Sequence, residues 1–102
     1  MKTFARFETD RASRYLASLC HHFGRKVDAA CDANSGWVQF PFGRCEMVAD
    51  ESQLDLMAAA ETDAHLDQVV QIVTNHLERF AFRENPTLDW QEQRGRHFSA
   101  IV

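Results

Sequence analysis

Four short strand-like runs follow one another between residues 26 and 59, and tight turns separate them. The segments DANSG (32–36) and DESQ (50–53) have the composition of turns. The last three runs alternate apolar and polar side chains, which is typical of strands that bury one face. The apolar positions are Val38, Phe40 and Phe42, then Cys45, Met47 and Ala49, then Leu54, Leu56 and Ala58. This pattern predicts an antiparallel meander with one apolar face.

Two segments with helical periodicity flank these runs. Residues 11–23 carry one apolar stripe, with a cap expected at Thr9–Asp10 and a stop at Gly24, where glycine can take the left-handed conformation. A second stripe follows the capping segment 61–63 and ends by Pro86, because the residue before a proline resists helix. Its members are Leu66, Val69, Val70, Val73, Leu77, Phe80 and Ala81. Residues 3–8 and 87–91 are predicted as the first and last strands.

The predicted order is strand, helix, four strands, helix, strand. Because each helix has one apolar stripe, the simplest architecture is a two-layer α+β sandwich. It has two helices on one face of an antiparallel sheet of about five to six strands. We expect a single domain over residues 1–92, and the tail 93–102 is left unassigned. Pro41 predicts an edge or a bulge, and Gly43 would permit a bulge that aims Arg44 and Cys45.

Charge and hydropathy exclude several classes of function. The formal charge is −4, whereas nucleic-acid binders usually carry a basic balance. No apolar run approaches the roughly 20 residues that span a bilayer. The start, MKTFARFETDR, carries charges where a signal peptide needs an apolar centre, so we expect a cytoplasmic protein. The three cysteines should then be reduced thiols.

The segment SLCHHFGRK (18–26) could belong to a metal site or to the polar end of a helix. Cys20 and His22 lie about 160° apart on a helical wheel, so they cannot chelate one ion in a regular helix. A transition-metal site would need ligands from elsewhere, chiefly Cys45 and His76. In the alternative interpretation, Cys20 is a small buried hydrophobe and His22 favours the helix C-terminus. This second interpretation is preferred.

A second candidate site is NHLERFAFRE (75–84), where Arg79 and Arg83 follow His76 on one flank of the helix. Cations at a helix C-terminus are stabilised by about 0.3–1 kcal/mol each, so the pattern also has a structural explanation. Functionally, arginines beside a histidine can receive a carboxylate or phosphate. Arg44 would join them if its strand lies beneath the helix. A nucleophilic role for Cys45 would need a nearby base, and no residue is assigned as catalytic.

Three of these segments resemble a small bacterial family, domain of unknown function 2218 (DUF2218). They are SRYLASLCHHFGRK, FPFGRCEMVAD and VVQIVTNHLERFAFRE, within a resemblance that runs from about Thr9 to Trp90. The matching polar positions are Cys20, His22, Lys26, Arg44, Cys45, His76, Arg79 and Arg83. The resemblance implies no reaction, but it implies a link to iron uptake, through a ferric siderophore or a siderophore-interacting flavin reductase.

The sequence therefore favours a non-enzymatic binding or accessory module without a cofactor. The expected ligand is a small acid or a ferric siderophore, and a flavin reductase is a possible partner. The expected ligand-binding residues are His76, Arg79, Arg83, Arg44 and Lys26. The alternative is a metal-binding or thiol-dependent enzyme that uses Cys20, His22, Cys45 and His76. A homodimer through the sheet face that carries Trp37 is a further possibility, while nucleic-acid and membrane binding are not expected.

Overall fold

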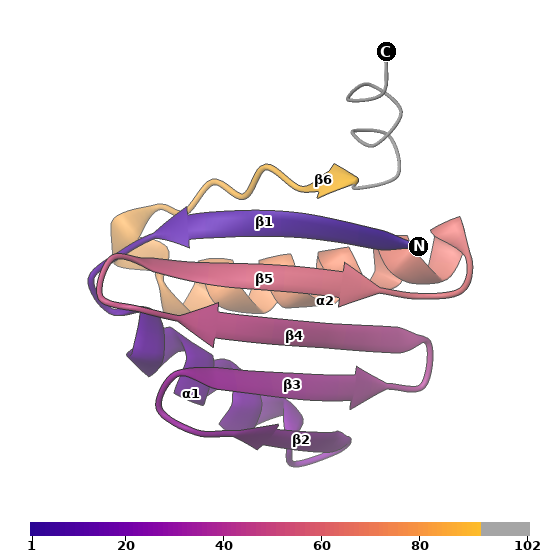
Figure 1. Ribbon diagram of the computed structural model, residues 1–102, viewed down its shortest axis with the longest axis horizontal. Helices are drawn as coiled ribbons and strands as arrows, with labels where there is room; N and C mark the ends of the chain where they lie inside the picture. The colour runs from indigo at the N-terminus through magenta and orange to yellow at the C-terminus, as the bar shows by residue number, and fades with distance from the viewer. Residues whose placement is uncertain (93–102) are drawn as a thin grey trace.

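The computed structural model describes residues 1–92, and the unassigned tail 93–102 lies outside the described residues. In chain order the elements are β1 (Lys2–Glu8), α1 (Ala12–Phe23), β2 (Asp28–Cys31), β3 (Ser35–Phe40), β4 (Gly43–Ala49), β5 (Gln53–Ala59), α2 (Asp63–Phe80), a 3₁₀ turn η1 (Phe82–Glu84) and β6 (Gln91–Glu92). The sheet order is β2-β3-β4-β5-β1-β6, and every neighbouring pair is antiparallel. Both helices cover the same face of this sheet (Figure 1). The predicted two-layer α+β sandwich is therefore confirmed.

The apolar face of the meander lies under the helices, as the alternation predicts. Cys45 is paired with Val38 on one side and with Ala58 on the other, and all three side chains are buried. Leu16 and Leu77, from the two helices, are fully buried above this face. Neither helix covers the opposite face of the sheet, so within residues 1–92 the two faces differ in character.

The two helices run antiparallel to each other on the sheet (Figure 1). Thr62 caps α2 by accepting a hydrogen bond from the backbone N–H of His65. The expected side-chain cap of α1 is absent, because the hydroxyl of Thr9 accepts from the backbone N–H of Arg11, before the helix begins. Neither α1 nor α2 combines the length and apolar character that a membrane-crossing helix needs.

Gly24 and Gly43 have roles that differ from the expected ones. Gly24 follows α1 with φ of −63°, so it does not take the left-handed conformation. Gly43 begins β4 opposite Phe40, and no extra residue interrupts the register. A Cβ at this position would lie 2.6 Å from both the Ala59 carbonyl oxygen and Val69 Cγ2. Gly43 therefore permits the close approach of β4, β5 and α2 rather than a bulge.

The end of the domain is less regular than the alternation predicts. The expected last strand over 87–91 is reduced to Gln91–Glu92, which pairs with Thr3 and Phe4 of β1. Before it, the indole N–H of Trp90 donates to the hydroxyl of Thr74 on α2, at 2.9 Å. This segment is anchored to the helix by a side chain instead of by ladder hydrogen bonds. Pro41 likewise lies in the turn after β3, outside the ladder.

Candidate functional site

Two histidines contact each other where the C-terminal turns of α1 meet α2. The rings of His22 and His76 have centroids 4.6 Å apart, with an angle of 46° between their planes. The two side chains are distant in sequence, and the antiparallel packing of the helices brings them together (Figure 1). Both side chains are half-buried, so the pair is partly accessible to solvent.

Aromatic side chains form the base beneath this histidine pair. Phe23 lies 4.7 Å from His76, and Phe80 lies 5.8 Å from His22, between ring centroids. Nδ1 of His76 is 2.7 Å from the carbonyl oxygen of Ile72. Because a carbonyl can only accept, this Nδ1 carries the hydrogen, and Nε2 of the neutral ring is an acceptor.

Three exposed cations, Arg25, Lys26 and Arg79, lie near His22. The pKa of His22 is lowered, first by burial and then by His76, Arg25, Arg79 and Lys26. All four neighbours carry or can carry positive charge. Within residues 1–92 the two ion pairs are Arg6–Asp55 and Arg44–Glu46, so the three cations of this site have no carboxylate partner there. We call the group His22, Arg25, Lys26, His76 and Arg79 the basic cluster.

Arg44 does not join the basic cluster, contrary to expectation. Its strand does lie beneath the helices, but its side chain is on the open face of the sheet. There the guanidinium lies 4.6 Å from the ring centroid of Trp37, and Nε donates to Glu46 at 2.9 Å. Cys45, the next residue, faces inward and is buried. Neighbours on a strand point to opposite faces, so the two residues could not both face the helices.

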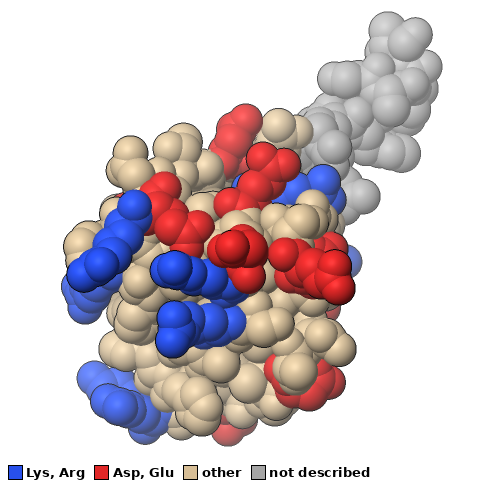
Figure 2. Space-filling model, turned by 90° about the vertical axis from the view of Figure 1, so that its left-hand side faces the viewer, with Lys and Arg blue, Asp and Glu red and all other residues tan. Residues whose placement is uncertain are grey.

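Arg83 is also separate from the basic cluster. It belongs to η1, and its guanidinium lies 5.8 Å from the ring centroid of Phe82. With Arg11 and Arg14 it lines a cavity of about 420 Å³ beside the start of α1. Figure 2 views the end of the molecule that carries η1, and there Lys and Arg gather toward one side and Asp and Glu toward the other.

The thiols proposed for metal binding or catalysis are buried. Cys45 is 1% exposed, and burial raises its pKa to about 12, with Glu46 and Cys20 adding to the effect. Burial likewise raises the pKa of Cys20 to about 12, and the thiol of Cys31 contributes. Sγ of Cys20 donates to the carbonyl oxygen of Ala30 at 3.3 Å. Neither thiol has the lowered pKa of a nucleophile.

The four expected metal ligands do not converge. His22 and His76 pair with each other, whereas Cys20 and Cys45 lie in the core. Among the residues that the structure describes, no three His, Cys, Asp or Glu side chains gather closely enough to hold a metal ion. The structure thus brings together half of the expected set, in a cationic setting that opposes a metal cation.

Three participants were missed by the sequence reasoning. Arg25 precedes Lys26 in the turn after α1, and the adjacent basic pair was the available signal. Arg11 and Arg14 approach Arg83 only through the packing of α1 beside η1, which no local pattern reveals.

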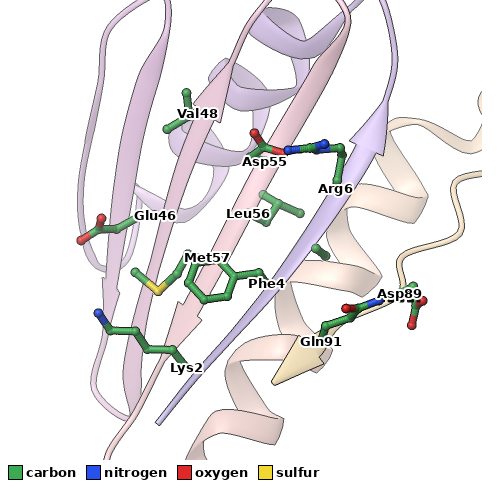
Figure 3. Close-up of a pocket in the computed structure, with 11 residues that line it drawn as sticks. Lys2, Phe4, Arg6, Glu46, Val48, Asp55, Leu56, Met57, Asp89 and Gln91 are labelled. Atoms are coloured by element: carbon green, nitrogen blue, oxygen red, sulfur yellow. Dashed lines mark hydrogen bonds and ion pairs between the residues drawn. The ribbon is translucent and has the colours of Figure 1, made fainter. Parts of the chain in front are cut away.

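A hollow of about 700 Å³ lies on the open face of the sheet (Figure 3). Phe4 and Met57 are paired across β1 and β5 in its centre, and Val48 extends the apolar surface. Nε of Arg6 donates to Asp55 at 2.8 Å at its edge (Figure 3). The hollow combines apolar side chains with paired charges, which suits a contact surface better than a chemical centre.

Comparison with known proteins agrees with this fold and gives no reaction. An NMR structure of PA4090 from Pseudomonas aeruginosa is similar, with a TM-score of 0.76 and 26% sequence identity. The similarity covers 88% of this chain and 94% of that chain. No curated protein matches. A family model described as an uncharacterized protein conserved in bacteria matches residues 4–91. The chain therefore belongs to the DUF2218 family.

Proposed function

We propose that this domain is a non-enzymatic, cytoplasmic module that binds an acidic ligand or partner through the basic cluster. The observation that carries the proposal is the gathering of three cations beside His22, which contacts His76, with no carboxylate partner for them within residues 1–92. The protein has a formal charge of −4, so this local excess of positive charge runs against its overall balance. Unpaired cations beside an aromatic base offer both charge and contact area to an anion.

The two kinds of side chain have different tasks in this proposal. Arg25 and Arg79 would hold a carboxylate or phosphate through charge-assisted hydrogen bonds, and Lys26 would add a point charge. The lowered pKa of His22 leaves its ring largely neutral at pH 7. A bound anion favours the protonated ring, so affinity should rise as the pH falls below 6.5.

The family resemblance supports one class of ligand in particular. We propose a ferric siderophore with an acidic periphery, delivered to or received from a flavin reductase. Ferric catecholate complexes carry negative charge, which the basic cluster complements. Its exposed cations also allow contact with an acidic patch on a partner protein.

Isothermal titration with a ferric catecholate siderophore tests this proposal. The Arg25→Ala/Arg79→Ala variant should bind at least about tenfold more weakly than wild type. Arg44→Ala is the control, because it removes an arginine from the opposite face of the sheet, and it should bind like wild type. Equal affinity of all three proteins, or a loss confined to Arg44→Ala, would remove the basic cluster as the recognition surface. Iron-free siderophore in a parallel titration separates recognition of the complex from recognition of its acid groups.

The geometry does not favour the alternative of a metal-dependent or thiol enzyme. It would need Cys45 or Cys20 as an accessible thiolate, and both pKa values are raised. Elemental analysis of protein purified without chelators gives a direct check. Stoichiometric bound metal would revive the alternative.

As a second candidate, we propose that the open sheet face pairs with a second copy of the chain. Val48 is 55% exposed at this face, and the face offers both Arg6 and Asp55 to a partner. A two-fold contact requires such self-complementarity of charge. Light scattering after size exclusion should give a dimer mass that Val48→Glu returns to the monomer. A monomer mass for wild type at high protein concentration would exclude the pairing.

A further inference from the structure

A cavity lined by arginines lies between the start of α1 and η1, apart from the basic cluster. Its volume is about 420 Å³, and Arg11, Arg14 and Arg83 line it from both sides. We call it the arginine pocket. None of its arginines forms an ion pair within 4 Å in residues 1–92, and no Asp or Glu is among its lining residues. Three guanidinium groups at one small cavity repel each other unless an anion lies between them.

One carboxylate, that of Glu84, lies beside the pocket near Arg11. Glu84 accepts a hydrogen bond from the hydroxyl of Tyr15, and Arg11 lies near both groups. The Tyr15 hydrogen bond is the main reason that the pKa of Glu84 is lowered, so this carboxylate stays ionised. Glu84 lies near Arg11, and none of the residues that line the pocket within residues 1–92 is an Asp or Glu, so its three arginines leave an excess of positive charge.

The rim of the arginine pocket is aromatic. Phe82 is 68% exposed, the highest value among the large hydrophobic side chains of residues 1–92. The single turn η1 presents it, and the turn ends at Asn85 in the left-handed conformation, with φ of 49°. Phe80 also lines the cavity. An exposed phenyl ring beside guanidinium groups offers a surface for a planar ring to stack on, next to donors for its acid group.

We propose that the arginine pocket binds a small aromatic oxyanion, either an aryl carboxylate or an aryl phosphate. The ring of the ligand packs on Phe82 and Phe80, and its oxygens accept from Arg14 and Arg83. The hydroxyl of Ser18, at the cavity wall, is a further donor. The volume lies within the range of about 300–1,000 Å³ usual for small-molecule sites. The proposal goes beyond the proposed function, because the pocket contains none of the five residues of the basic cluster, although Phe80 borders both.

NMR titration of the ¹⁵N-labelled full chain can measure separately how much the ring and the charge of the ligand contribute to binding. Phenyl phosphate and benzoate should shift the amide signals of Ser18 and Phe82 in a saturable way. Inorganic phosphate, which has the charge without the ring, should bind at least about threefold more weakly than phenyl phosphate. Benzamide, which keeps the ring and loses the charge, should bind at least about tenfold more weakly than benzoate. The two acids also distinguish a carboxylate ligand from a phosphate ligand.

Variants locate the binding. Arg14→Gln/Arg83→Gln should weaken phenyl phosphate binding about tenfold or more, and Phe82→Ser should abolish the preference over inorganic phosphate. Arg44→Gln, on the open face of the sheet and outside both sites, is the control and should leave the phenyl phosphate shifts of Ser18 and Phe82 unchanged. Loss of binding in the control equal to that in the double variant would overturn the proposal. Equal binding of benzoate and benzamide, or no saturable shift with either acid, would overturn it too. Siderophore binding by the basic cluster is measured separately, so either site can fail alone.

Discussion

Cysteine reactivity should distinguish the three thiols by their surroundings. Cys45 and Cys20 have pKa values of about 12, so at pH 8 only about one molecule in 10⁴ carries either thiolate. Cys31 is exposed on an edge strand. Folded protein treated with N-ethylmaleimide should therefore be modified first at Cys31, as followed by mass spectrometry of its peptides. In denaturant all three should react at similar rates. Rapid labelling of Cys45 in the folded protein would contradict its burial and reopen a role as nucleophile.

The Tyr15–Glu84 hydrogen bond should make a pH-dependent contribution to stability. It joins α1 to η1, and it holds the pKa of Glu84 below its ordinary value of 4.5. A carboxylate with a depressed pKa stabilises the folded state above its unfolded pKa and loses that effect as the pH falls through the folded pKa. Tyr15→Phe should lower the free energy of unfolding by about 1–2 kcal/mol at pH 7. Urea denaturation at pH 3 should show a smaller difference. A difference that does not change with pH would mean that packing, rather than charge, is lost.

At the scale of elements, the cap of α2 is the clearest test of how the sequence defines a helix. The hydroxyl of Thr62 accepts from the backbone N–H of His65 at 3.1 Å. Thr62→Ala should lower the free energy of unfolding by about 1 kcal/mol, and Thr62→Ser, which keeps the hydroxyl, should cost much less. Urea titrations of the three proteins give the comparison. Equal stability of the Ala and Ser variants would show that the cap is not needed, since the long apolar stripe of α2 already fixes the helix.

The fold could be predicted from the spacing of apolar residues within each helix and strand. The site could not, because it depends on how the elements pack against one another. Alternation at Cys45, Met47 and Ala49 defined the inner face of β4 correctly. The same alternation places Arg44 outward, so this misplacement was avoidable. The contact of His22 with His76 could not be predicted in this way, because it depends on the relative direction and offset of two helices. No local pattern fixes that offset, and the same holds for Arg11 and Arg83.

Across the whole molecule, the charged side chains on the two sides of the sheet differ in whether they form ion pairs. On the open face, arginines are paired with carboxylates, as in Arg6–Asp55 and Arg44–Glu46. On the helical side, the cations of the basic cluster and the arginine pocket have no such partners within residues 1–92. An ion pair neutralises the charge of both side chains, whereas a cation without a carboxylate partner can still bind an anion. Anion recognition is therefore expected along the helices and protein contact on the sheet.

This division predicts how stability should respond to pH and to anions together. His22 has a lowered pKa in the folded state. Its contribution to the free energy of unfolding is therefore fully present above the unfolded pKa of 6.5, and it is lost as the pH falls through the folded pKa. Under the proposed function, phosphate at millimolar concentration should offset the loss, because it would bind the protonated basic cluster in the folded state only. We expect the melting temperature to fall between pH 7 and pH 5 in chloride, and to fall less in phosphate at equal ionic strength. His22→Gln should reduce both effects, while His21→Gln, on the exposed face of α1, is the matched control and should keep them. Identical curves in chloride and phosphate would show that the histidine pair responds to burial alone and holds no anion.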